Sequence, residues 1–127
     1  MDREAIQTKG APQAIGPYSQ AVRAGSLLFL SGQIGLDPDS GTMAAADVAG
    51  QMRQVLKNIE AVLAAGGSGL GRVVKSTIYL RRMTDFPEVN AIYGEAFQPP
   101  FPARATVAVA GLPLDAEVEM DVVAIVD

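Results

Sequence analysis

Two segments with a helical spacing of apolar residues, each set between strand-like runs, limit the folds open to this chain of 127 residues. The first runs from Asp47 to Ala65, and its apolar residues recur every three or four positions, as on one face of a helix. They are Val48, Met52, Val55, Leu56, Ile59, Val62 and Leu63. Gly66 and Gly67 follow, where a helix commonly ends. This segment predicts a long helix that packs against a sheet through one face.

A second, shorter helix is predicted from Asp85 up to the proline cluster at 99–102. Asp85 and Glu88 have the spacing of a capping box, and Pro87 lies in the first turn, where proline is tolerated. The apolar stripe consists of Val89, Ile92, Tyr93, Ala96 and Phe97. The prolines that follow cannot continue a helix, so we expect the helix to end there.

Five runs of apolar, β-branched or alternating residues predict strands before, between and after the two helices. They lie at residues 20–23, 27–30, 73–80, 103–110 and 117–126. The first two are expected to form a hairpin, and the last two a second hairpin. We expect the apolar run 27–30 to be buried on both faces of the sheet, and residues 1–18 to form an irregular arm.

This order predicts an α+β fold in which a single mixed β-sheet carries two helices on one face, with residues 1–127 as a single domain. Hydrophobic residues make up 49% of the chain. With the 13 glycines added and the 3 tyrosines left out, the share rises to about 57%, which exceeds the ~45–50% typical of proteins on that definition. A chain this short buries only about two thirds of its unfolded surface. Since no third layer is available, a neighbouring subunit is expected to cover the other sheet face.

The residues that the chain lacks narrow its chemistry. It has no Cys and no His, which excludes disulfides, Cys nucleophiles, Cys/His zinc sites and a Ser-His-Asp triad. A net charge of −4 without a basic run makes nucleic acid an unlikely partner. The chain shows no signal peptide and no apolar stretch of the ~20 residues that a membrane helix needs. We therefore expect a cytoplasmic protein without a membrane partner.

Two charged residues interrupt otherwise apolar strand faces. Arg104 begins a strand whose same face continues with small residues, and Glu119 stands in a row of carboxylates that ends in apolar residues. Both could be solvated or could form a cross-strand ion pair. Alternatively, Arg104 could bind a ligand carboxylate through its planar guanidinium while Glu119 orients or deprotonates water. The pattern alone leaves these interpretations open.

Several of these segments together resemble one family, the Rid or reactive intermediate deaminase family, also called YjgF. The similar segments are Ile15-Gly16-Pro17-Tyr18-Ser19-Gln20-Ala21, Phe29-Leu30-Ser31-Gly32-Gln33-Ile34, Asn90-Ala91-Ile92-Tyr93, Pro102-Ala103-Arg104-Ala105-Thr106-Val107, Leu112-Pro113 and Glu117-Val118-Glu119-Met120. The likeness runs nearly end to end, and the arginine segment with its downstream glutamate is similar to that of the imine deaminases, the RidA subfamily.

The resemblance implies a chorismate-mutase-like subunit in a homotrimer, with sites in the clefts between subunits. It implies an enzyme without a cofactor or metal, which hydrolyses small-molecule 2-imino acids such as 2-iminobutanoate and 2-iminopropanoate to 2-oxo acids and ammonia. Arg104 matches the arginine that holds the substrate carboxylate. Glu119 matches the glutamate that positions or activates the attacking water.

The resemblance also assigns substrate-binding positions. Tyr18 matches a tyrosine that lines the cleft, Ser31 and Gly32 match the strand-end pair at the site, and Asn90 matches the helix asparagine near it. Thr106 is also a substrate-binding position: it stands where many relatives carry Cys, so a thiol plays no role here, but contacts through its backbone are still expected. From pattern alone, the tyrosine segment could also be only a packed turn, and the Ser-Gly pair only a strand exit.

Two other classes of function remain as alternatives to the enzyme. The same cleft could bind or sense a small carboxylate such as a ketoacid without turnover. The second alternative is an RNA-directed or chaperone-like role, known for family members. The acidic charge of the chain argues against binding to RNA.

Overall fold

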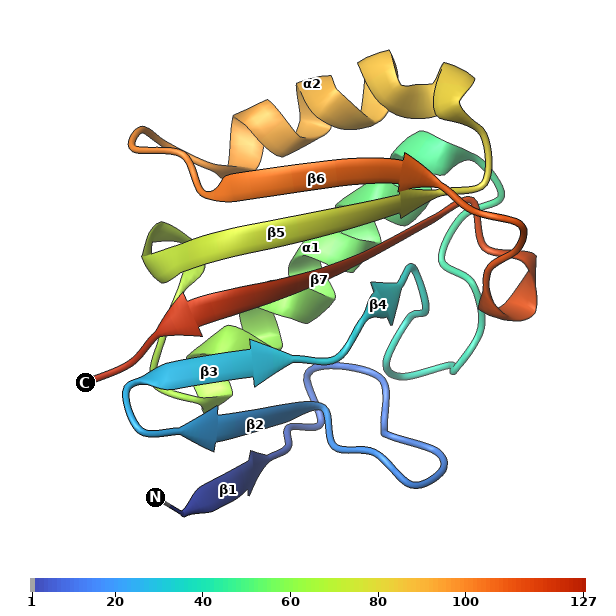
Figure 1. Ribbon diagram of the computed structural model, residues 1–127. Coiled ribbons are helices and arrows are strands. Elements are labelled where there is room, and N and C mark those ends of the chain that lie inside the picture. The colour runs from blue at the N-terminus through green and yellow to red at the C-terminus, as the bar shows by residue number, and fades with distance from the viewer. Residues whose placement is uncertain (1) are drawn as a thin grey trace.

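The computed structural model describes residues 2–127 and contains one seven-stranded sheet with two helices on one of its faces (Figure 1). The helices are α1 (Val48–Ala65) and α2 (Phe86–Ala96). The strands are β1 (Arg3–Ile6), β2 (Ala21–Ala24), β3 (Leu27–Leu30), β4 (Gln33–Ile34), β5 (Val73–Leu80), β6 (Ala103–Ala108) and β7 (Val118–Ile125). Short 3-10 turns are η1 (Leu70–Arg72), η2 (Met83–Asp85) and η3 (Pro113–Asp115). The predicted α+β class, with two helices on a mixed sheet, is confirmed.

The strands follow the order β1-β2-β3-β7-β5-β6, and β4 also pairs with β7. Strands β5 and β6 are parallel and are joined through α2, whereas every other pair is antiparallel. The predicted hairpin of β2 and β3 is confirmed. The predicted hairpin of the last two strands is wrong, because β7 lies between β3 and β5 while β6 pairs only with β5.

The place of β7 follows from what it buries. Its side chains Val118, Met120, Val122 and Ala124 are fully buried under the helices, so the strand fits the centre of the sheet. Strand β6 carries the exposed Arg104 and forms an edge, where a charged side chain is tolerated. Sequence spacing favours a hairpin, but burial decides the pairing.

The first strand departs from the expected irregular arm. Residues Arg3–Ile6 pair antiparallel with β2, whereas residues 7–19 are irregular. Three of the four β1 residues are exposed, so the strand lacks the alternation that would reveal it in the sequence.

The core lies between the sheet and the helices. The whole predicted stripe of α1 is buried, and Gly66 ends the helix with Gly67 at a positive φ of 82°. On α2 the buried residues are Val89, Ile92 and Tyr93, and the Tyr93 ring stacks on Phe97 at 4.3 Å. Asp85 makes no capping hydrogen bond, so the predicted capping box is wrong. The preceding turn η2 holds Asp85 in a helical conformation, which differs from the extended one that a cap requires.

The opposite sheet face has no covering layer in the single chain. Leu27 and Phe29 pair with Ile125 and Val123 on this face, and Leu27, Phe29 and Ile125 remain exposed. The prediction that residues 27–30 are buried on both faces is therefore wrong for one chain, since only Leu28 and Leu30 are buried. We call this surface the open face.

Within residues 2–127, neither helix is both long enough and apolar enough to cross a membrane.

Candidate active site

Four of the predicted site residues lie around one pocket of about 470 Å³. Tyr18 comes from the loop before β2, Ser31 and Gly32 from the break between β3 and β4, and Glu119 from β7. Strand β3 stops pairing with β7 after Phe29, and pairing resumes at Gln33. The gap in the ladder leaves room for the pocket beside Glu119.

Gly32 has a specific steric role at this break. A Cβ atom added to Gly32 would lie 2.2 Å from Oε2 of Glu119 and 2.9 Å from its Cδ. The Glu119 carboxylate therefore lies directly against the Gly32 backbone, and any larger residue would displace it. Glycine at this position permits the close approach of the carboxylate.

Hydrogen bonds connect the strand break to the loop that carries Tyr18. The Ser31 hydroxyl donates to the Ser19 carbonyl at 2.5 Å, and the Ser31 backbone N–H donates to the Gln20 carbonyl at 3.0 Å. The Tyr18 N–H donates to the Gly16 carbonyl at 2.9 Å, and Gly16 has a φ of 118° that favours glycine. Ser31 thus fixes the position of the tyrosine loop, and its hydroxyl is already engaged.

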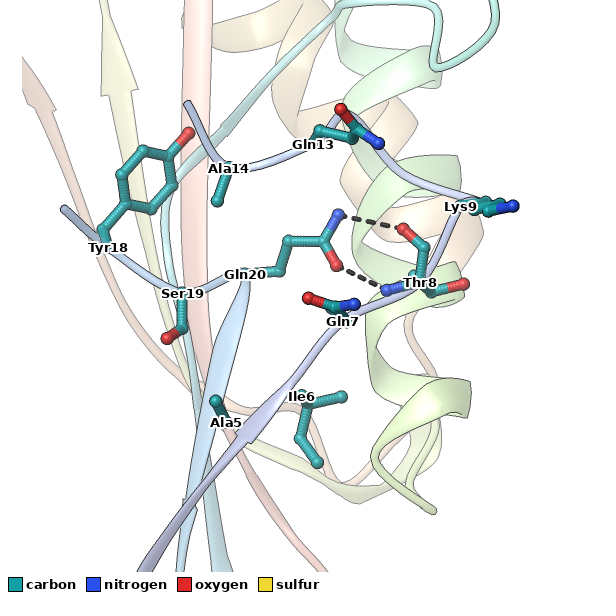
Figure 2. A pocket seen from close by; sticks show the side chains of 10 residues that line it. All are labelled: Ala5, Ile6, Gln7, Thr8, Lys9, Gln13, Ala14, Tyr18, Ser19 and Gln20. Atoms are coloured by element: carbon teal, nitrogen blue, oxygen red, sulfur yellow. Dashed lines mark hydrogen bonds between the residues drawn. The ribbon is translucent and has the colours of Figure 1, made fainter. Parts of the chain in front are cut away.

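Gln20 is a positioning residue to which the sequence interpretation assigned no role. Its buried amide accepts from the Thr8 N–H at 2.6 Å and donates to the carbonyls of Thr8, Ala11 and Pro12 at 3.1, 3.3 and 2.7 Å. Figure 2 shows Gln20, just before β2, reaching to the segment around Thr8, beside a second pocket of about 390 Å³. The partners lie eight to twelve residues earlier in the chain, so no local motif indicates them.

The other predicted residues form a second cluster at the edge strand. Nη1 of Arg104 donates to Oδ1 of Asn90 at 2.7 Å, and the guanidinium carbon lies 4.8 Å from the centre of the Tyr93 ring and 5.5 Å from that of Phe86. The Thr106 hydroxyl, two residues along β6, is buried and has no hydrogen-bond partner among the described residues. Arg104 itself is exposed, so most of its donors are available to a ligand.

The two clusters lie on opposite faces of the sheet. Arg104 pairs with Ser76, which pairs with the buried Val122, whereas Glu119 pairs with Tyr79 on the open face. Arg104 and Glu119 are also separated within the plane of the sheet. They lie two strand spacings of about 4.8 Å each apart across the strands, and three residues of about 3.3 Å each apart along them. The interpretation of Arg104 and Glu119 as a cross-strand ion pair is therefore wrong. A single chain does not bring the two predicted catalytic residues together.

The electrostatics around Glu119 favour proton exchange. Its carboxyl group is half-buried, and this burial raises its pKa; the negative charge of Asp121 raises it further. Asp121 in turn accepts a hydrogen bond of 2.9 Å from the Tyr79 hydroxyl, and this bond, followed by burial, raises the pKa of Tyr79. A carboxyl group with a raised pKa exchanges protons closer to neutral pH than an exposed glutamate does.

No group of three or more acidic, His or Cys side chains within residues 2–127 is arranged to hold a metal ion.

The sequence model of the family described as endoribonuclease L-PSP matches residues 8–126. This chain belongs to the YjgF/Rid family. A RutC family protein of Pyrococcus horikoshii is 47% identical over 122 residues, which cover 96% of this chain and 97% of that protein. The 2-iminobutanoate/2-iminopropanoate deaminase of Homo sapiens is 46% identical over 123 residues, which cover 97% of this chain and 90% of that protein.

Solved structures of the Rid family have the same fold. A Rid family protein from Yersinia pestis superimposes with a TM-score of 0.96 at 46% identity, and the match covers 98% of this chain and 100% of that one. The TdcF protein of E. coli, solved with bound serine, superimposes with a TM-score of 0.90 at 37% identity, covering 98% of this chain and 99% of that one.

Proposed function

We propose that this protein hydrolyses 2-imino acids, among them 2-iminobutanoate and 2-iminopropanoate, to 2-oxo acids and ammonia. The observation that carries the proposal is the half-buried Glu119 carboxylate against Gly32, at a pocket of small-molecule size. Relatives named 2-iminobutanoate/2-iminopropanoate deaminase, 43–46% identical over nearly the whole chain, support it.

The active unit we propose is a homotrimer of single-domain subunits, each made of residues 1–127. In it, Arg104, Asn90 and Thr106 of one subunit face Glu119 and Tyr18 of the next across the cleft between them. Two observations support this assembly: the clusters lie on opposite sheet faces of one chain, and the open face exposes apolar side chains that a second copy would bury.

In the proposed reaction, Arg104 binds the substrate carboxylate with its free donors while Asn90 holds one guanidinium nitrogen in place. Tyr18, Ser31 and Gly32 line the cleft. Water adds to the imine carbon and loses a proton to the Glu119 carboxylate, while the imine nitrogen takes a proton from solvent. In the resulting carbinolamine, Glu119 returns its proton to the amino group and the hydroxyl loses its proton to solvent. The C–N bond breaks, ammonia leaves and the 2-oxo acid forms. Positioned proton transfer of this kind contributes roughly 10²–10⁴-fold.

The test supplies the purified protein with 2-imino acids generated in place by an amino-acid oxidase and follows the release of 2-oxo acid. We expect a faster release, lost in Arg104→Ala and kept in Arg53→Ala, a matched control whose guanidinium pairs with Glu95 on the helix side at 3.2 Å. A release rate that the protein leaves unchanged would refute the proposal.

A non-catalytic role in binding small carboxylates is the second candidate. The structure of TdcF with bound serine, itself an amino acid with a carboxylate, favours it. Saturable binding of 2-oxobutanoate that needs Arg104, without any effect on imine hydrolysis, would select this role. We do not propose RNA cleavage, despite the family's description, because a net charge of −4 disfavours binding to phosphates.

A further inference from the structure

A strained turn precedes β7 and faces the pocket of Glu119. The Ala116 N–H donates to the Pro113 carbonyl at 3.1 Å and closes the turn. Its two central residues have left-handed backbones: Leu114 has φ 54° and ψ 32°, and Asp115 has φ 53°. Such turns are normally built from Gly, Asn or Asp, and leucine is rarely found there.

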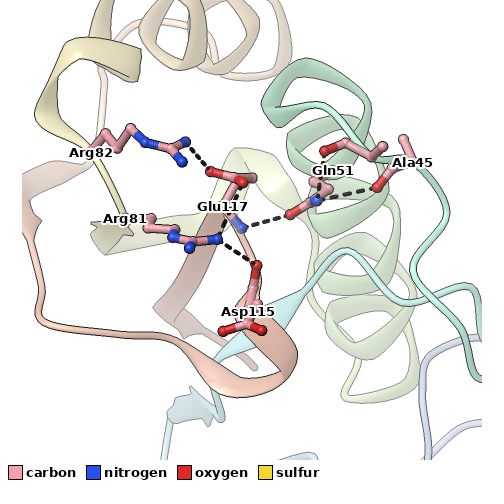
Figure 3. A network of polar contacts seen from close by, with 7 residues as sticks. Ala45, Gln51, Arg81, Arg82, Asp115 and Glu117 are labelled. Carbon is pink, nitrogen blue, oxygen red and sulfur yellow. Dashed lines mark hydrogen bonds and ion pairs between the residues drawn. The ribbon is translucent and has the colours of Figure 1, made fainter.

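The surrounding side chains hold this turn in place. Arg81 lies 3.5 Å from the Asp115 carbonyl, and both Arg81 and Arg82 pair with the Glu117 carboxylate, at 3.6 and 2.8 Å. The buried Gln51 amide accepts from the Glu117 N–H at 2.8 Å. Figure 3 shows these groups gathered around the chain from Asp115 to Glu117. These contacts hold the chain just after Leu114 in place. Glycine at position 114 would relieve the strain of its left-handed backbone.

The Leu114 side chain is directed to the pocket instead of the core. It is 70% exposed, and it lines the same pocket as Glu119. Ile15, which is 86% exposed, comes from the N-terminal loop to line this pocket as well, together with Ile34 and Pro113. Asp115, its neighbour in the turn, does not line the pocket. An apolar wall therefore stands beside the proposed water-activating carboxylate.

We propose that Leu114 determines which substrate side chain the site accepts and favours 2-imino acids with branched or aromatic apolar side chains over 2-iminopropanoate. The inference rests on the proposed function. When Arg104 of the neighbouring subunit holds the carboxylate and Glu119 holds the water, the remaining substituent of the imine carbon is the side chain. The wall of Leu114 and Ile15 is the apolar surface next to it, and contact between them excludes water from both.

The experiment compares Leu114→Gly with Asp115→Gly. Both changes relieve a left-handed residue in the same turn, but only the first removes a side chain from the pocket. We measure kcat/KM for the imines of leucine and alanine and the melting temperature of each variant. In Leu114→Gly the preference for the leucine-derived imine should fall about tenfold or more, the range expected when an apolar contact in a pocket is lost. In Asp115→Gly it should stay within about twofold.

Binding of 2-oxo acids separates this inference from the proposed function. Leu114→Gly should weaken binding of 4-methyl-2-oxopentanoate but not of pyruvate, and this result supports the inference even if no imine is hydrolysed. An unchanged preference in Leu114→Gly, or an equal change in Asp115→Gly, would overturn it. Leu114→Asn, which tolerates the left-handed backbone, serves as a second variant should the glycine variant unfold.

Discussion

At the scale of single residues, the close contact of Gly32 with the Glu119 carboxylate constrains the proposed site. The atom that a new Cβ would meet is the end of a flexible side chain, so the fold can accommodate alanine if Glu119 rotates away. We therefore predict that Gly32→Ala changes the free energy of unfolding by only about 1 kcal/mol while it abolishes most imine hydrolysis. Urea unfolding and the oxidase-coupled assay measure the two effects. A stable variant with full activity would contradict the role of this contact.

The charge of Asp121 predicts a pH effect. Burial and Asp121 raise the pKa of Glu119, and the carboxylate form is the one that accepts a proton from water, so kcat/KM should fall as the pH drops through that raised pKa. Asp121→Asn removes the second cause, lowers the pKa of Glu119, and should move this acid limb to lower pH. Tyr79→Phe, which retains the Asp121 charge, is the matched control and should not move the limb downward. A limb at the same pH in Asp121→Asn would show that burial alone sets it.

Replacing the Thr106 hydroxyl should have opposite effects on stability and on ligand binding. Thr106→Val replaces a buried hydroxyl that has no hydrogen-bond partner within residues 2–127 by a methyl group of similar size, which should stabilise the fold by about 1 kcal/mol or more. If the hydroxyl serves the substrate, the same change should weaken 2-oxobutanoate binding. Thermal unfolding and calorimetric titration test both. A variant that binds as tightly as the native protein would remove Thr106 from the site.

The sequence predicts the residues of the proposed site but not their arrangement. Arg104 and Glu119 stand out because each interrupts an apolar strand face. That they lie on opposite faces depends on the order of β5, β6 and β7, which alternation does not reveal. The sequence indicated no role for Gln20, because its hydrogen-bond partners are distant in the sequence. It indicated none for Leu114, because that role depends on the backbone conformation.

At the scale of elements, local periodicity predicts the helices, and non-local pairing explains the errors. Helix α1 follows directly from its stripe, since the signal lies within one element. The insertion of β7 between β3 and β5 depends on contacts between distant segments, and the order of elements was compatible with a hairpin instead. The short strand β1 forms only because β2 offers an edge.

The N-terminal loop depends on Gln20. Gln20→Ala removes four hydrogen bonds to the segment from Thr8 to Pro12, and buried groups left unpaired cost about 1–3 kcal/mol each. We predict faster amide exchange in residues 8–18 and a higher KM, because the loop also carries Tyr18 and Ile15. Gln7→Ala, an exposed change in the same segment, is the control. Exchange that stays at the native rate would argue against this role of Gln20.

At the scale of the whole molecule, the two faces of the sheet are the basis of the proposed oligomer. Its helix side is buried, while its open face leaves Leu27, Phe29 and Ile125 exposed. The half-site with Arg104 lies at one edge and the half-site with Glu119 lies on the open face. In our proposal, the assembly that covers the apolar surface also brings the two half-sites together.

The most direct test of this central claim is complementation between two inactive variants. Arg104→Ala and Glu119→Gln are co-expressed with different tags, and the mixed oligomers are isolated and assayed for imine hydrolysis. If each site takes Arg104 from one subunit and Glu119 from the next, every mixed trimer should contain one complete site out of three. The isolated mixed trimers should therefore regain about one third of the native activity, whereas each variant alone stays inactive. Mixed oligomers that remain as inactive as either parent would contradict a site shared between subunits.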